Sequence, residues 1–240
     1  MMKKRTLVFL TLLIIGFLSG WPGEGLAGVV VEQVVRDRDG SPSKVFLYFS
    51  EYRFRTDHQE GGLTTIMDFR ADRLVMIDHR SKSYAEVKLS EWEREVARRL
   101  KQEFPGVKPK ERKIIVRKTG KTAVINGFQT EQIEVVTGGE LIEENWMTRD
   151  VEMKEVEQVM DRVAQGFSKD FRIEMKEGRE IYEKLKPYGY PILIKDYTMT
   201  HGLGAIDRVE VKKMEKKELE KELFLPPSGY QRIVPEPPKR

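Results

Sequence analysis

The sequence predicts an α+β protein in which a curved antiparallel sheet turns its concave face toward helices. Residues 29–89 and 114–148 contain short apolar runs separated by turn residues, and an amphipathic helical pattern follows each group. The 240 residues include no cysteine, so packing and backbone hydrogen bonds must hold the fold together. Strands joined by tight turns pair with their neighbours, which favours an antiparallel meander.

The first 28 residues have the pattern expected of an export leader and its cleavage site. Three basic residues, Lys3, Lys4 and Arg5, precede an apolar run over residues 7–18, and small residues follow at Gly25, Ala27 and Gly28. This order is typical of a secretory signal peptide. The apolar run is shorter than the roughly 20 residues that a membrane-spanning helix needs. We therefore expect a signal peptide over residues 1–27, cleavage after Ala27, a periplasmic or secreted protein, and no permanent membrane span.

The mature chain is nearly neutral and long enough for one core. Without the leader, which carries Lys3, Lys4, Arg5 and Glu24, the net charge falls from +4 to +2. A nucleic-acid partner would need a basic patch on the folded domain, so we expect none. The length predicts a single domain over residues 28–234. Residues 235–240 are short, prolyl and charged, which predicts a loose C-terminal tail.

Strands are expected over residues 29–35, 44–56, 63–69, 74–79 and 84–89. Alternation within two of these runs predicts large apolar groups on one strand face, and the alternating residues are Phe46, Tyr48, Tyr52 and Phe54, then Leu63, Thr65, Met67 and Phe69. A helix is expected from Ser90, which begins a capping box with Glu93, and Pro105-Gly106 ends it.

The second strand group is expected over residues 114–118, 123–125, 128–136 and 140–148, separated by turns at Thr119-Gly120-Lys121, Asn126-Gly127 and Gly138-Gly139. Asp150 is the expected N-cap of a second helix that ends near Gly166 or Ser168. A third helix is expected over 173–186, and strands over 192–200 and 205–215 flank a turn at 201–204. Four apolar residues, Leu219, Leu223, Phe224 and Leu225, are expected to dock the last segment onto the core.

The sequence contains no complete catalytic or metal-binding motif. Gly-Lys-Thr at residues 120–122 lacks the earlier glycine of a phosphate-binding loop, which predicts a hairpin turn instead. His58, His79 and His201 are the only histidines, each in or beside a predicted turn, whereas zinc needs at least three converging ligands. No serine lies in a Gly-x-Ser-x-Gly motif. We expect no catalytic residue, no metal and no cofactor, and therefore no enzyme.

The apolar stripes of the first two helices allow two interpretations. Either they are ordinary core, or the helices cover an incompletely filled cavity that accepts an apolar ligand, with flexible methionines fitting variable shapes. In the second interpretation the residues expected to line the cavity are Trp92, Val96, Leu100, Met153, Val156, Met160 and Phe167.

Several segments also carry a resemblance. The segments are Val29-Val30-Val31-Glu32-Gln33, Tyr52-Arg53-Phe54-Arg55, Ile66-Met67-Asp68-Phe69, Leu74-Val75-Met76-Ile77-Asp78, Lys82-Ser83-Tyr84-Ala85-Glu86, Ile125-Asn126-Gly127-Phe128 and Phe224-Leu225-Pro226-Pro227-Ser228-Gly229-Tyr230. Together they cover nearly all of the mature chain. The chain resembles exported bacterial domains of unknown function, family 4412 of that series, which are similar to the LolA/LolB lipoprotein-carrier superfamily. The resemblance implies a half-open antiparallel β-barrel with helices covering the concave face, and none of its motifs is catalytic.

These observations predict a non-enzymatic extracytoplasmic protein that binds an apolar ligand in the cavity under its helices. The expected ligand is a lipid, or an acylated or apolar segment of a lipoprotein or another envelope protein. The alternative is an envelope protein-interaction or sensing module with a fully packed barrel and no small-molecule ligand, in which strand edges or a charged helix face bind a partner.

Overall fold

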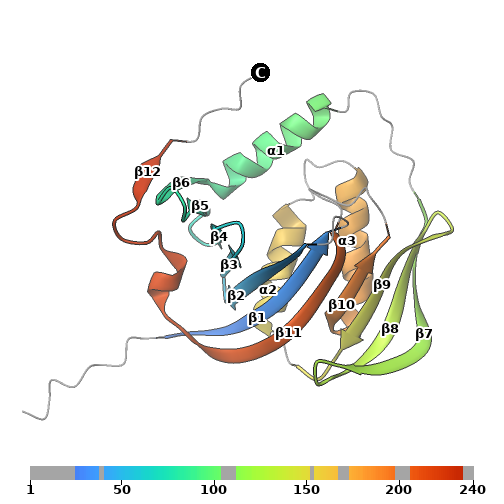
Figure 1. Ribbon diagram of the computed structural model, residues 1–240. Coiled ribbons are helices and arrows are strands. Elements are labelled where there is room, and N and C mark those ends of the chain that lie inside the picture. Colours follow the sequence, from blue (N-terminus) through green and yellow to red (C-terminus); the bar gives the residue numbers. More distant parts are fainter. Residues whose placement is uncertain are drawn as a thin grey trace, which may run out of the picture.

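The computed structural model describes residues 25–37, 41–103, 112–151, 154–166, 173–197 and 206–234. Over these residues the strands form one 12-stranded sheet in the order β12-β6-β5-β4-β3-β2-β1-β11-β10-β9-β8-β7. All neighbouring strands in this sheet are antiparallel except β12 and β6, which are parallel. The sheet is curved, and α2 and α3 lie in its concavity (Figure 1). The predicted α+β class, with a curved antiparallel sheet and helices on its concave face, is confirmed.

The elements are, in chain order, β1 (Leu26–Asp37), β2 (Pro42–Ser50), β3 (Arg53–His58), β4 (Leu63–Asp68), β5 (Arg73–Asp78), β6 (Ser83–Lys88), α1 (Leu89–Glu103), β7 (Ile114–Ile125), β8 (Phe128–Thr137), β9 (Glu140–Thr148), α2 (Lys154–Gly166), α3 (Ile173–Leu185), η1 (Lys186–Tyr188), β10 (Tyr190–Asp196), β11 (Ile206–Leu219), η2 (Lys221–Phe224) and β12 (Gln231–Ile233).

Several expected segments fall outside the described residues. These are most of the leader (residues 1–24), the turn at 201–204 and the tail at 235–240. β1 begins at Leu26, so its first two residues belong to the predicted leader, and they pair with Leu219 and Glu218 of β11. Within the described part of the chain, no helix combines the length and apolar character that crossing a membrane requires.

The run at residues 44–56 forms two strands rather than one. β2 ends at Ser50, β3 begins at Arg53, and Phe49 lies directly opposite Phe54. Phe46 and Tyr48 therefore share one face of β2, whereas Phe54 points to the other face. The prediction of a single strand is wrong because the turn at residues 51–52 contains no glycine, proline or asparagine to mark it.

The opposite error occurs in β7. Residues 119–121, predicted as a turn between two strands, lie inside one continuous strand, and the pairing with β8 shifts register between Lys118 and Thr122. Gly120 has φ of 80°, the positive value that a bulge of this kind tolerates best in glycine. The two hairpin predictions are confirmed: Asn126-Gly127 and Gly138-Gly139 have positive φ at both turn positions, as a type I′ turn requires.

Both predicted helix caps differ from the structure. α1 begins at Leu89, and Ser90 donates its backbone N–H and its hydroxyl to the carboxylate of Asp72, at 2.8 and 2.7 Å. Asp72, in the β4–β5 turn, therefore caps α1 in place of the expected capping box. α2 begins at Lys154, and the Asp150 carboxylate instead accepts the backbone N–H of Gln129 at 2.8 Å.

α2 and α3 are joined through one carboxylate. Asp161 on α2 accepts the hydroxyl of Tyr182 at 2.9 Å and the ammonium of Lys186 at 2.8 Å. Burial, and then this hydrogen bond, raises the pKa of the Tyr182 phenol. α3 is also bound to the β7 side by the bidentate pair between Arg112 and the buried Glu177. The two helices therefore form one unit in the concavity.

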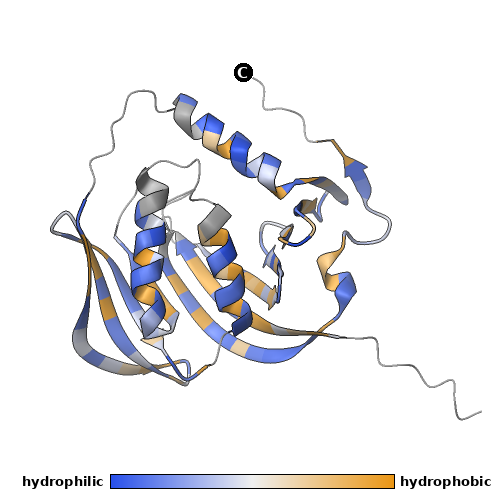
Figure 2. Ribbon diagram, turned by 180° about the vertical axis from the view of Figure 1, so that it is seen from behind, coloured by the Kyte–Doolittle hydropathy of each residue, from blue (hydrophilic) through white to orange (hydrophobic). Residues whose placement is uncertain are grey.

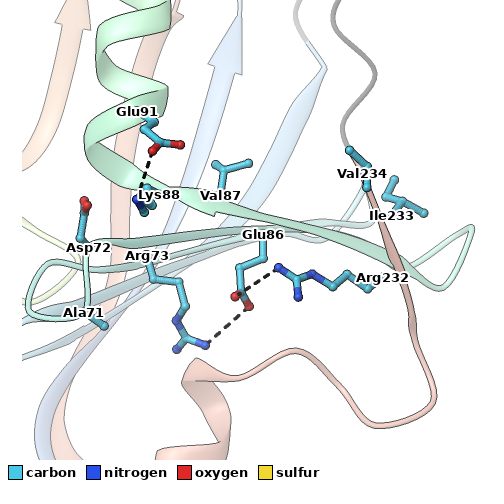
Figure 3. Close-up of a pocket in the computed structure, with 10 residues that line it drawn as sticks. All are labelled: Ala71, Asp72, Arg73, Glu86, Val87, Lys88, Glu91, Arg232, Ile233 and Val234. Atoms are coloured by element: carbon cyan, nitrogen blue, oxygen red, sulfur yellow. Dashed lines mark ion pairs between the residues drawn. The ribbon is translucent and has the colours of Figure 1, made fainter.

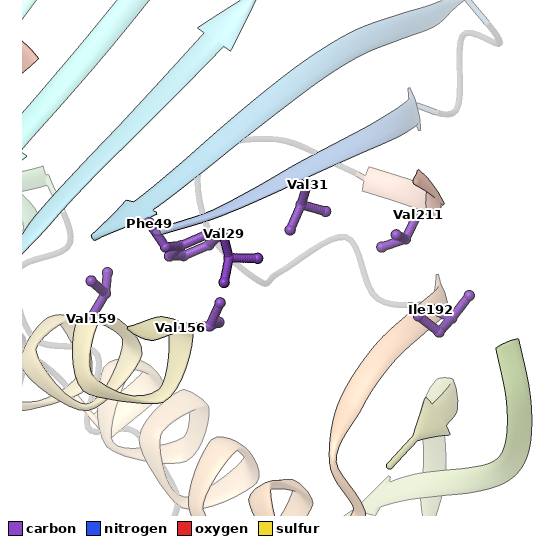
Figure 4. Close-up of a cluster of buried hydrophobic side chains, with 7 residues drawn as sticks. All are labelled: Val29, Val31, Phe49, Val156, Val159, Ile192 and Val211. Carbon is purple, nitrogen blue, oxygen red and sulfur yellow. The ribbon is translucent and has the colours of Figure 1, made fainter. Parts of the chain in front are cut away.

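The core of the concave face lies under α2. Its fully buried members come from β1, β2, β10, β11 and α2, and they are Val29, Val31, Phe49, Val156, Val159, Ile192 and Val211 (Figure 4). Seen from behind, α2 and the strands next to it carry apolar residues alternating with polar ones (Figure 2). A smaller cluster under α3 contains Ile114, Val135, Ile142 and Ile181.

The opposite, convex face of β3–β6 is covered by the C-terminal strap, which we define as residues 219–233. Leu219 and Phe224 are 3% and 1% exposed and pack with Val30, Ile66, Val75 and Ile77, and Leu223 packs against the same cluster. The predicted docking of these three strap residues is confirmed. Leu225 was expected to dock with them, but it is 45% exposed. β12 then pairs with Ser83–Ala85 at the sheet edge, a strand that the sequence pattern did not predict.

Candidate functional site

An unbroken row of apolar side chains crosses the concave face. The register places six residues directly opposite one another on successive strands from β1 to β6, and we call these residues the concave row: Val29, Phe49, Phe54, Met67, Leu74 and Val87. Directly opposed residues of antiparallel strands point to the same face. Because Val29 and Phe49 pack against α2, the whole row faces the helices.

The concave row is fully buried at its β1–β2 end and only partly buried from β3 to β6. Val29 and Phe49, under α2, are 0% and 1% exposed. Phe54, Met67 and Val87 are only half-buried, although Leu74 between them is buried. A second row beside the first repeats the trend, since Val31 is buried, whereas Leu47 and Met76 are half-buried.

The helices rest on different ends of the row. α2 packs mainly on β1 and β2, whereas α1 follows β6 directly and packs on β5 and β6. Figure 1 shows α1 separate from the α2–α3 unit, on the far side of the concavity. The half-buried residues Phe54 and Met67 lie on β3 and β4, between these two supports. This stretch of the concave face is the candidate site.

On the convex face of the same strands, a chain of polar groups lies beside the apolar cover of the strap. Asp57 accepts the guanidinium of Arg55 at 2.8 Å and the hydroxyl of Thr64 at 2.6 Å, and Thr64 lies 2.8 Å from Nε2 of His79. Nδ1 of His79 is 3.0 Å from the Tyr230 hydroxyl. In the neutral ring, Nε2–H therefore donates to Thr64 and Nδ1 accepts from Tyr230. His58 is exposed, as a turn histidine should be, but His79 is tied to the strap.

Arginine side chains fix the strap further. Arg55 and Arg73 donate to the backbone carbonyls of Leu223 and Phe224. Arg53 pairs with the buried Asp68 at 2.9 Å. Burial alone would raise the pKa of Asp68, but the backbone N–H of Ala71 and the Arg53 guanidinium outweigh it and hold the pKa below its usual value. The convex face is thus closed by specific hydrogen bonds as well as by Phe224.

Two larger hollows border these strands. One, of about 690 Å³, lies at the edge of β6 near the start of α1 and is lined by Ala71, Asp72, Arg73, Glu86, Val87, Lys88, Glu91, Arg232, Ile233 and Val234 (Figure 3). The other, of about 520 Å³, lies beside the polar chain and is lined by Phe46, Tyr48, Arg55, Asp57, His58, Gln59, Gly62, Leu63, Thr64 and His79. Val87 belongs both to the first hollow and to the concave row.

The residues expected from sequence to line a cavity have different environments. Val156 is 2% exposed and belongs to the packed cluster under α2, and Met160 is half-buried at the edge of that cluster. Trp92 and Val96 are half-buried on α1, at the other end of the row. Leu100 lies on α1, but its side chain is not described, and Met153 and Phe167 lie outside the described residues. The four described side chains among them, Trp92, Val96, Val156 and Met160, do not line either of the two hollows above.

Sequence reasoning concentrated on the helices and missed most of the row that they face. The alternation at residues 63–69 did identify Met67 as facing one side of its strand. Phe54 was assigned to the wrong face, because the turn before β3 was not recognised. Among the described residues, no three His, Asp or Glu side chains gather in a way that could hold a metal ion.

The fold and the site define a curved-sheet α+β protein with an apolar concave face. The chain belongs to a family described as "Domain of unknown function (DUF4412)", whose model matches residues 27–230. No curated protein matches the sequence.

Solved structures show only distant similarity. The crystal structure of MucB has a TM-score of 0.42 and 12% identity, and the match covers 86% of this chain and 60% of that chain. PNGF-II in the C2 space group has a TM-score of 0.38 and 7% identity, covering 87% of this chain and 31% of that chain. This chain therefore spans less than two thirds of either protein. Similarity at this level carries no argument about function.

Proposed function

We propose that this is a non-enzymatic extracytoplasmic protein that binds an apolar ligand on the concave row, between α1 and α2. The observation that carries the proposal is the half-buried state of two residues that continue the buried row of Val29 and Phe49. Phe54 packs at the edge of the cluster under α2, and Met67 follows it on the row outside that cluster. The ligand class is a lipid, or an acylated or apolar protein segment. The basic head and apolar run of the leader support the extracytoplasmic location.

The dimensions and energies suit an acyl chain. Six adjacent strands spaced about 4.8 Å apart place the ends of the concave row roughly 24 Å apart. One leaflet of a bilayer core is about 15 Å thick, half of the roughly 30 Å of the whole core, so one acyl chain fits along the row. Each methylene buried there contributes about 0.8 kcal/mol. Half-buried Met67 and Met76 add flexible side chains that adapt to ligands of different shape.

A second candidate function is an interaction or sensing module without a small ligand. The fully buried cluster under α2 favours it, because Val159 and Ile192 there are 0% exposed. β7 is the last strand at one end of the described sheet, and its side chains Ile115 and Val124 are 40% and 63% exposed. An open strand edge with exposed apolar residues is a surface on which a partner strand can pair.

The amount of lipid that the purified protein retains distinguishes the two functions. The chain is expressed with its leader and purified from the envelope fraction, and organic extracts are analysed by mass spectrometry. We expect acyl lipid in near-stoichiometric amount and a mature amino terminus near Gly28. A clean extract favours the interaction module, and an intact Met1 contradicts export.

A pair of variants places the ligand on the row. Met67→Gln puts a polar amide into the half-buried row and is expected to lower lipid retention several-fold. Leu63→Gln is the matched control, because Leu63 lies on the same strand and the same face but is 51% exposed at the strand end. Equal retention by the two variants would contradict a ligand on the concave row.

A further inference from the structure

The edge of the sheet at β6 is only partly covered. β12 pairs with Ser83, Tyr84 and Ala85, and the pairing stops there. Glu86, Val87 and Lys88 form the remaining half of β6, and all three line the hollow of about 690 Å³. The hollow is therefore located where the sheet edge is open, beside the first turn of α1 (Figure 3).

Arg73 gives one guanidinium N–H to the carbonyl of Phe224, and the charges around this hollow leave its other donors and those of Arg232 available. Arg73 and Arg232 approach the same carboxylate, Glu86, at 4.0 and 3.7 Å, distances too long for hydrogen bonds. The other carboxylates are engaged elsewhere, because Asp72 caps α1 and Glu91 pairs with Lys88 at 3.2 Å.

Arg232 in particular can donate hydrogen bonds to a bound anion. Its side chain is 62% exposed, and the described residues offer it no polar partner other than Glu86. Two guanidiniums thus share one carboxylate on one side of the hollow. A carboxylate or phosphate of a ligand can supply the second anionic partner.

The other wall of the hollow is apolar and leads to the concave row. Ile233 and Val234 are 44% and 88% exposed beside it. Val87 is the terminal member of the concave row, and its side chain points to the opposite side of β6 from Glu86 (Figure 3). A molecule lying across the open edge can therefore contact Arg232 with one end and Val87 with the other.

We propose that this hollow binds the acidic head of a single-chain amphiphile, whose acyl chain continues past Val87 onto the concave row. This inference rests on the proposed function and names its ligand class: an acyl chain that carries a carboxylate or a phosphate. The guanidiniums of Arg73 and Arg232 hold the head, and the open half of β6 is the entrance by which the chain reaches the concave face.

The test uses the purified mature protein, freed of lipid, and isothermal titration with three probes below their micelle concentrations. Laurate and dodecyl phosphate have an anionic head, and dodecyl maltoside has the same chain length with a neutral head. We expect the anionic probes to bind about fivefold more tightly than the neutral one, the effect of one partly exposed ion pair, with the difference shrinking as salt is added.

Arg232→Gln should remove this preference while leaving binding of dodecyl maltoside unchanged. Arg70→Gln is the matched control, because Arg70 is a similarly exposed arginine, 69% against 62%, that lies outside this hollow. Equal binding of the three probes by the wild-type protein, or a preference that survives in Arg232→Gln, overturns the inference and leaves the proposed function standing. Inorganic phosphate bound as tightly as dodecyl phosphate overturns it as well. Failure of all three dodecyl probes to bind overturns the proposed function itself.

Discussion

Two neighbouring regions of the sheet are covered on opposite faces. Around β1 and β2 the concave face is sealed by α2, with Val159 fully buried against it. Across β3–β6 the convex face is sealed by the C-terminal strap, with Phe224 as its apolar anchor. The difference teaches that the strap supplies a core on the convex face of β3–β6 without an α-helix there, whereas Phe54, Met67 and Val87 on the concave face remain half-buried. A half-buried apolar surface thus lies on strands whose other face is packed.

The strap's importance is best tested at its anchor. Phe224→Ala removes a side chain that is 1% exposed and leaves a cavity against Ile66 and Val75. We expect a loss of about 3–5 kcal/mol in the free energy of unfolding, measured by urea denaturation. Leu225→Ala, one residue on and 45% exposed, is the control and should cost below about 0.5 kcal/mol. Similar losses for the two variants would show that the strap does not form the core of this region.

The helix-covered region should respond to a smaller truncation. Val159→Ala deletes two methyl groups that are fully buried between α2 and the sheet. The expected loss is about 2 kcal/mol, from lost burial and the cavity together. A thermal melt of the same variant should still be cooperative, because β3–β6 have their own core. A much larger loss would indicate that the two regions share a single core.

The polar closure of the convex face predicts a dependence on pH. The pKa of Asp68 is lower in the folded protein than its usual value, so the carboxylate contributes stability above the unfolded pKa of about 4 and loses that contribution as the pH falls through the folded value. Asp68→Asn leaves Arg53 without its ion-pair partner. The free energy of unfolding should fall by about 1.5 kcal/mol at pH 7. Urea midpoints at pH 7 and pH 3 should differ less in the variant than in the wild-type protein. An unchanged difference would exclude Asp68 as a source of acid sensitivity.

The smallest effect is expected at the end of the polar chain. Tyr230→Phe removes the hydroxyl that bonds His79 and keeps the ring packed against the strap cluster. We expect a loss of about 1 kcal/mol in the free energy of unfolding. The imidazole resonances of His79 in NMR spectra at fixed pH should change in Tyr230→Phe, because the hydrogen bond at Nδ1 is lost, but not in the control Tyr52→Phe, whose ring lies under Arg70 instead.

How far the sequence predicts this structure depends on whether a local signal exists. The hairpins at Asn126-Gly127 and Gly138-Gly139 follow directly from residues that favour positive φ, and the amphipathic stripes of α1 and α2 mark helices of nearly the expected extent. The β2–β3 turn has no such residue, so the two strands look continuous in the sequence. β12 is three exposed residues long and is defined only by its pairing with β6.

The candidate site was harder to predict for a different reason. Whether a helix stripe is core or cavity depends on what lies opposite, and Val156 and Trp92, alike in sequence pattern, belong to helices at different ends of the concave row. The concave row is a property of cross-strand register, which no single segment encodes. Likewise, Arg73 and Arg232 are far apart in the chain and meet at Glu86 only because the strap returns to the β6 edge.

The pairing of β1 with β11 determines when the molecule can be completed. β1 lies in the middle of the sheet, held on one side by β2 and on the other by the last long strand of the chain. Contacts between such distant segments form slowly, because a very large loop must close first. If the chain crosses a membrane amino terminus first, as the proposed export requires, β1 has no partner on its β11 side until residues 206–219 have arrived. The middle of the sheet is then completed only after this late segment has crossed.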